Sequence, residues 1–269
     1  MKETGTGAGA LRFVSFGHVL FAASMITIGV MGLMKGEFVL IWSGVPEGIP
    51  VRHTLAYLCA LVSVGSGLGT LWKRTAAFTA GALLAYLVLW LALFRAPLVA
   101  RTPTAPGNWW VFGETSAMIA GAWVLLIGFT GDRSGARLGF VTSDVGLRIA
   151  RFFYALGVIQ FGIGHFTFLE RTVGMVPGWL PWHIGWAYFT GGALIAAGVA
   201  ILAGVLARQA ALLSAWELTL FTLLVWVPSV IRGPNAEQWN EFVESCVLTG
   251  TAWLVTESYR SIRRGTQTH

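Results

Sequence analysis

The sequence predicts an all-α, polytopic membrane protein with eight transmembrane helices, arranged as two pseudo-symmetric four-helix bundles with both termini in the cytoplasm. Three observations support this fold class. Of the 269 residues, 55% are hydrophobic and only 11% are charged. The apolar residues fall into eight long runs. Motifs of the first half also return, in the same order, in the second half.

The internal repeat has a nearly constant period. The segment 45–50, Val-Pro-Glu-Gly-Ile-Pro, returns 131 positions later at 176–181 as Val-Pro-Gly-Trp-Leu-Pro. The pattern Trp-x-x-Phe-x-Glu at 109–114 returns 130 positions later at 239–244. Self-similarity at a fixed period is the signature of a repeated architecture. We therefore divide the chain into a first four-helix repeat (1–131), a polar cytoplasmic linker (132–146) and a second four-helix repeat (147–269).

Each apolar run matches a membrane-spanning helix. A hydrocarbon core of roughly 30 Å needs a helix of about 20 residues. The runs lack the alternation of barrel strands, and only helices and closed barrels satisfy the backbone in hydrocarbon. The expected spans are 13–34, 55–72, 76–94, 111–130, 149–168, 184–207, 210–231 and 241–256. Four spans therefore fall in each repeat.

The basic residues predict the orientation, because cytoplasmic loops are enriched in Lys and Arg. With both termini inside, only six of the 18 basic residues lie in outer loops. These six are Lys35, Arg52, Arg95, Arg101, Arg171 and Arg232. The pattern indicates a bacterial-type inner (plasma) membrane protein. Since each repeat has an even number of spans, the pseudo-two-fold axis should lie along the membrane normal. The positive charge is then a topology signal, and we expect no nucleic-acid partner.

Ionisable groups inside a bilayer are costly, so they are the first functional candidates. Glu217 lies nine residues after Arg208, which at about 1.5 Å per residue places it roughly 13 Å deep. The first repeat has no acid at the equivalent place, in the stretch 81–87. We expect Glu217 to face protein and to be neutral at pH 7. Glu217 either forms a hydrogen bond with a neighbouring helix or takes part in ligand binding or proton transfer.

The outer face of the second repeat is the other candidate site. Pro177 and Pro181 should stiffen a short cap between the fifth and sixth spans, because proline fixes φ and has no N–H. Glu217, His165 and Glu244 are the catalytic candidates. The residues expected to hold a small amphipathic ligand, such as a quinone or a lipid headgroup, are Trp179, Trp182, His183, Trp239 and Glu244.

Plainer interpretations of the same residues stay open. Tryptophans at this level commonly form an interfacial belt. Glu114 and Glu244 each lie near a helix start, where the dipole favours a carboxylate. No metal is expected, because the histidines and acids show no short ligand spacing. Cys59 and Cys246 lie in different halves inside apolar runs, so we expect buried free thiols rather than a redox pair.

The second half also carries a group of motifs that occur together in one family. They are Arg151, Gly157, Gly-Ile-Gly-His-Phe at 162–166, the segment 176–181, Tyr-Phe-Thr-Gly-Gly at 188–192, Arg208 and the segment 239–244. About 110 residues of this half resemble the four-helix DoxX-like (DoxX/DoxD) membrane proteins. The first half is similar only through Arg12, the segment 45–50, Arg74 and the segment 109–114. The chain departs from the family in being a tandem duplication and in having no cysteine pair.

The resemblance implies a small bundle that is associated with membrane redox systems. Two functions follow as expectations. The first is an accessory or scaffold subunit of a redox or electron-transfer complex, which packs against other membrane-protein subunits and binds lipid, quinone or pigment at its helix surfaces. The alternative is a quinone-linked oxidoreductase subunit, of the thiosulfate:quinone type, with a proton-handling site.

Overall fold

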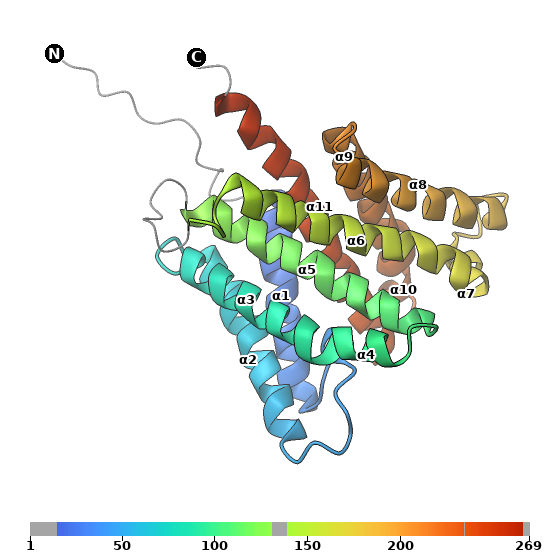
Figure 1. The fold of residues 1–269 in the computed structure, drawn as a ribbon. Helices are drawn as coiled ribbons and strands as arrows, with labels where there is room; N and C mark the ends of the chain where they lie inside the picture. The colour runs from blue at the N-terminus through green and yellow to red at the C-terminus, as the bar shows by residue number, and fades with distance from the viewer. Residues whose placement is uncertain (1–14, 131–138, 234, 266–269) are drawn as a thin grey trace.

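The computed structural model describes residues 15–130, 139–233 and 235–265, and every regular element in these ranges is a helix (Figure 1). The first half contains α1 (Phe16–Lys35), η1 (Leu40–Trp42), α2 (Arg52–Leu71), α3 (Ala76–Trp90), η2 (Leu91–Arg95), α4 (Ala96–Arg101) and α5 (Pro106–Thr130). The second half contains α6 (Asp144–Thr167), α7 (Leu169–Met175), α8 (His183–Ala203), α9 (Ala207–Phe221), η4 (Thr222–Trp226), α10 (Val227–Ile231) and α11 (Ala236–Gly265).

Seven helices of the described residues are long and apolar enough to cross a membrane. This confirms a polytopic helical membrane protein. The segments α3, η2 and α4 together form one of these helices, and α9, η4 and α10 form another. The expected eighth span, 241–256, lies inside the 30-residue helix α11, which is not among the seven. The number eight therefore stays a prediction.

Side-chain caps explain where several helices begin. The hydroxyl of Ser15 accepts the His18 N–H at the start of α1, and Ser143 accepts the Gly146 N–H at the start of α6. At the start of α11, Asn235 and Gln238 each accept the other's backbone N–H through their side chains. Such caps satisfy backbone donors that a helix start leaves unpaired.

The element bounds repeat with the same period as the motifs. Residue 52 begins α2 and residue 183 begins α8, and residues 76 and 207 begin α3 and α9, each 131 positions apart. The wide π-helical turns η2 and η4 begin at residues 91 and 222, again 131 apart. A proline follows each turn, at Pro97 and Pro228. Because proline has no N–H and its ring crowds the carbonyl four residues earlier, a wide turn at this point is expected.

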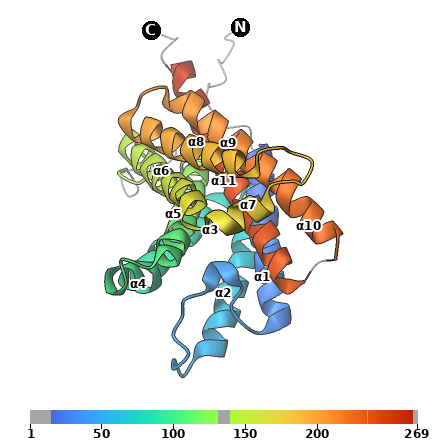
Figure 2. The same ribbon diagram turned by 90° about the vertical axis from the view of Figure 1, so that its right-hand side faces the viewer.

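The most buried helix is α5, with 78% of its apolar window inside the protein against 33% for α8. It packs against α3, α6 and α11, while α1 packs against α2 and α11 (Figure 1). Figure 2 shows α8 and α9 side by side, and they pack against α6 and α11, respectively. The two halves are thus joined by three helix pairs: α5 with α6, α1 with α11, and α5 with α11.

Two of these junctions depend on glycines. A Cβ on Gly157 of α6 would lie 2.7 Å from the Gly113 carbonyl oxygen of α5. A Cβ on Gly250 of α11 would lie 2.7 Å from the Phe21 backbone nitrogen of α1. Small residues permit this close approach of helices in membranes. Gly17, at the start of α1, likewise packs against Leu254, so α1 begins and α11 ends at the same end of the protein.

Candidate functional site

Two acids meet in the centre of the protein, one from each half. Glu114 of α5 and Glu244 of α11 are 3% and 5% exposed. Their carboxyl groups lie within hydrogen-bonding reach of each other. Each acid is eight residues beyond the first residue of its helix, 106 and 236. At a rise of about 1.5 Å per residue, both therefore lie roughly 12 Å inside the helix ends. We call these two residues the acid pair.

The acid pair has unsatisfied hydrogen-bonding capacity. Within the described part of the chain, no donor reaches Oε2 of Glu114 or Oε2 of Glu244. The indole of Trp110 lies within hydrogen-bonding reach of the Glu114 carboxyl group. Trp110 is itself held in place, because its ring fills the space beside Gly164 and lies 5.4 Å from the ring of Phe161. Buried polar atoms are usually paired, so these two oxygens are the part of the site that can still take a proton or a hydrogen bond.

Arg95 supplies the positive charge that acts on both acids. It is only 1% exposed. Its guanidinium donates to the carbonyl oxygens of Ile41 (2.6 Å) and Ser43 (2.8 Å), and its Nε donates to the Thr115 hydroxyl at 3.3 Å. These three acceptors carry no charge. Its donors are satisfied by Thr115 of α5 and by the loop that contains η1 and Ser43 (the η1 loop), and the acid pair acts on its charge without an ion pair within 4 Å among the described residues.

The backbone explains how an arginine reaches this position. Arg95 is the last residue of the π-helical turn η2, two residues before Pro97. In a regular helix each residue turns the chain by about 100°, so one extra residue per turn redirects the side chains that follow. The loop that receives the guanidinium bends at Gly44, whose φ is 83°. A Cβ there would lie 2.9 Å from Nη1 of Arg95, so glycine lets the loop close over the guanidinium.

A third acid lies between the acid pair and the first residue of α11. Glu241 acts electrostatically on both members of the pair. It is three residues before Glu244, which places both on one face of the helix. Its side chain is 19% exposed and accepts a hydrogen bond at 2.6 Å from Arg171 at the protein surface. The acids thus form a short series from the surface to the buried pair.

The other residues predicted for the site lie elsewhere. His165 is buried, with Nδ1 2.8 Å from the Phe161 carbonyl oxygen and its ring 5.3 Å from that of Phe221. Glu217 is half-buried on α9, and its Oε1 is a buried atom with no hydrogen-bond partner among the described residues. Both are placed inside the second half. No hydrogen bond of theirs links them to Glu244 in the described part of the chain.

The aromatic residues of the predicted cap are largely exposed. Trp179 is 72% and Trp182 is 87% exposed, Trp239 is also exposed, and His183 is half-buried. Glu244, by contrast, is buried. With the three tryptophans exposed and Glu244 buried, these five residues do not form one enclosed site for a quinone. The cap over Glu244 stays a prediction.

Arg95 is the site residue that sequence reasoning misplaced. It was expected in an outer loop, and the structure buries it because the π-helical turn directs it toward the acid pair. The available signal was an arginine inside an apolar helix, close to Pro97 and in the same half as Glu114. Charges buried in a membrane protein are paired with other charges or with backbone carbonyls, and Arg95 has both kinds of neighbour.

The two cysteines have separate environments. Cys59 is buried, and its Sγ lies 2.8 Å from the Tyr86 hydroxyl oxygen. Cys246 lies on α11 and is half-buried, and both thiols are free.

No protein-family model, no curated protein and no solved structure matches the chain. The site is therefore interpreted from its own geometry.

Proposed function

We propose that this chain is an integral membrane subunit of a redox or electron-transfer complex, similar to DoxX-like proteins, and that the acid pair with Arg95 is its proton-handling site. The observation that carries the proposal is the contact between two buried carboxyl groups beside one buried guanidinium. The association with a redox complex is supported by the motifs of the second half.

Charge balance favours one proton on the acid pair. Two ionised carboxylates in contact repel each other, and a dry interior penalises each unpaired charge. One proton between the two oxygens would give a carboxyl–carboxylate hydrogen bond with a single negative charge. Arg95 would balance that charge. The pair would then exchange its proton with the outer surface through Glu241, one turn nearer to the start of α11.

We also infer the finer topology from the repeated helix bounds. If α11 is the eighth span, as α5 is the fourth, both halves cross the membrane in the same direction. The start of α1 and the end of α11 would then lie on the cytoplasmic face of a bacterial-type inner membrane. The acid pair would lie close to the pseudo-two-fold axis, because one acid comes from each equivalent helix.

A scaffold without proton chemistry is the second candidate. It is favoured by the glycine junctions, which pack the interior closely, and by the exposed aromatic side chains of Trp179, Trp182 and Trp239. In this function the aromatic side chains contact lipids or other membrane-protein subunits. The acid pair would then be only a structural hydrogen bond.

The two functions differ in what happens when the acids are neutralised. The full chain is purified gently, together with the redox proteins that accompany it, as wild type, as Glu114→Gln/Glu244→Gln, and as the control Glu217→Gln. Infrared spectroscopy measures the C=O band of protonated carboxyl groups. Electron transfer to a soluble quinone analogue measures activity. A proton-handling site predicts that the double substitution removes the band of the acid pair and lowers the rate by about a hundredfold.

The amount of co-purified complex should stay unchanged in the double variant, because the glutamines keep the shape of the acids. The control should keep its electron-transfer rate, since Glu217 lies on another helix. Full rate and an unaltered carboxyl band in Glu114→Gln/Glu244→Gln would exclude proton handling by the pair and favour the scaffold.

A further inference from the structure

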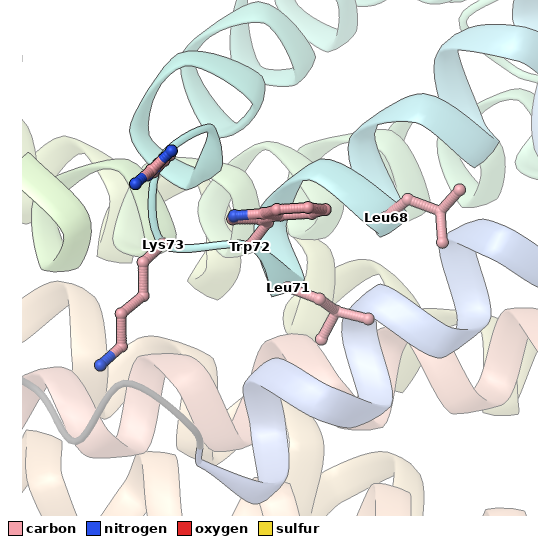
Figure 3. A pocket seen from close by; sticks show the side chains of 5 residues that line it. Leu68, Leu71, Trp72 and Lys73 are labelled. Atoms are coloured by element: carbon pink, nitrogen blue, oxygen red, sulfur yellow. The ribbon is translucent and has the colours of Figure 1, made fainter.

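A groove lies at the turn between α2 and α3, far along the chain from the acid pair. It has a volume of about 550 Å³ and is lined by Leu68, Leu71, Trp72, Lys73 and Arg74. Figure 3 shows Lys73 on one side of Trp72, with Leu68 and Leu71 on the other side. The groove therefore has one apolar end along α2 and one cationic end at the turn.

Hydrogen bonds fix the shape of this turn. The Thr75 hydroxyl donates to the Gly69 carbonyl oxygen at 2.7 Å and approaches that of Trp72 at 3.2 Å. The backbone N–H groups of Thr75 and Ala76 both donate to the Trp72 carbonyl. Only four residues separate α2 from α3. The two cations are consequently held next to the end of a membrane helix rather than on a long loop.

The exposed side chains of the groove match the two parts of a phospholipid. Leu68 and Trp72 are 55% and 68% exposed on the end of a helix that is apolar enough to span the membrane. Hydrocarbon chains can cover this apolar end, and an indole prefers the boundary between chains and headgroups. The Lys and Arg side chains at the turn can bind a phosphate by charge-assisted hydrogen bonds. The basic-residue pattern also predicts that this turn faces the cytoplasm, where anionic lipids attract basic segments.

The equivalent turn of the second half has no pair of adjacent cations, and its cation, Arg208, is the second residue of α9. The residues 131 positions beyond Lys73 and Arg74 are Gly204 and Val205. This turn also connects two apolar helices, α8 and α9, and exposes Val205 and Leu206. The apolar surface is therefore shared by both turns, and the pair of adjacent cations occurs only in the first. The charge at residues 73 and 74 is not needed to make the turn.

We propose that the α2–α3 groove binds one anionic phospholipid, with its phosphate on Lys73 and Arg74 and its acyl chains along Leu68, Leu71 and Trp72. Free phosphate offers the same headgroup chemistry but no chains. The site goes beyond the proposed function, because it does not involve the acid pair. It gives the first half a lipid contact that the second half does not have.

The test uses the full chain in nanodiscs of equal parts phosphatidylcholine and phosphatidylglycerol, followed by native mass spectrometry of the lipid that stays bound. Lys73→Gln/Arg74→Gln should lower bound phosphatidylglycerol by about tenfold, because both cations that hold the phosphate are lost. The control Lys35→Gln/Arg208→Gln removes the same charge from exposed residues outside the groove. It should lower bound phosphatidylglycerol by less than about twofold.

A third variant distinguishes binding of a phospholipid from binding of free phosphate. Leu71→Ala/Trp72→Ala keeps both cations and should also lower phosphatidylglycerol retention several-fold, since the chains lose their contact. Equal retention in wild type and Lys73→Gln/Arg74→Gln would overturn the proposal. Full retention in Leu71→Ala/Trp72→Ala, with displacement by inorganic phosphate, would show a phosphate site and overturn the lipid assignment.

Discussion

The two halves contain the same bent helix but stabilise the bend with different chemistry. In the first half, the π-helical turn ends at Arg95, whose guanidinium binds the η1 loop and Thr115. In the second half, the turn begins at Thr222, whose hydroxyl lies 2.7 Å from the Ser245 hydroxyl and 2.9 Å from that of Thr249. Trp226 stands where the repeat would place an arginine, 131 positions after Arg95.

This difference explains why one site forms from two similar halves. Both halves supply an acid at the same depth in equivalent helices, so the acid pair contains one residue from each half. Only the first half supplies a buried cation, so the positive charge beside the pair has no counterpart in the second half. Ser245 is the counterpart of Thr115, 130 positions later, and it binds a hydroxyl where Thr115 binds a guanidinium. The two halves thus share a π-helical turn, and the turn of the first half alone ends in a charged residue.

The largest expected effect comes from removing the cation. Arg95→Met leaves the acid pair without its counter-charge and the η1 loop carbonyls without donors. A buried acceptor left without its donor costs about 1–3 kcal/mol, so the loss of two carbonyl partners and of the nearby positive charge should lower the free energy of unfolding by about 3–5 kcal/mol. Denaturant unfolding of the purified protein in detergent measures this loss.

A double-mutant cycle then separates charge from packing. In the Glu114→Gln/Glu244→Gln background, Arg95→Met should cost at least about 1.5 kcal/mol less than in wild type, because neutral amides need no counter-charge. If the cost is the same in both backgrounds, Arg95 acts through the η1 loop alone and the ionic account of the first half is wrong.

Much of the fold was predictable from composition, because the expected spans coincide with helices and each half has its bent helix. The depth of Glu114 and Glu244 was underestimated: both were expected near a helix start, but α5 and α11 begin earlier than the expected spans, and each acid lies eight residues beyond the first residue of its helix. The contact between the two acids was not predicted, since it depends on α5 packing against α11 across more than a hundred residues of sequence. Arg95 was expected in an outer loop, and its burial within a helix was not predicted for a related reason. A π-helical turn changes the direction of a side chain without altering the hydropathy pattern.

Disturbing the π-helical turn η4 of the second half should lower the free energy of unfolding by less than Arg95→Met does. Thr222→Val keeps the shape of the side chain and removes the hydroxyl that joins η4 to Ser245 and Thr249. Losing this group should cost about 1–2 kcal/mol, because the remaining hydroxyls lose a partner but carry no charge. The same unfolding assay measures it. A loss as large as that of Arg95→Met would remove the distinction between an ionic and a neutral bend.

The smallest change in unfolding free energy is expected for Tyr86 and Glu217, which occupy equivalent positions 131 residues apart on α3 and α9. The Tyr86 hydroxyl lies 2.8 Å from the Cys59 thiol, whereas Oε1 of Glu217 is buried with no hydrogen-bond partner among the described residues. Tyr86→Phe removes a paired hydroxyl and should cost about 1 kcal/mol. Glu217→Gln replaces a carboxyl group that we expect to be neutral with an amide of the same shape, so it should change the unfolding free energy by less than about 0.5 kcal/mol. A larger loss for Glu217→Gln than for Tyr86→Phe would mean that Glu217 is ionised and paired. A charged site would then exist on the same helix as the neutral bend of the second half.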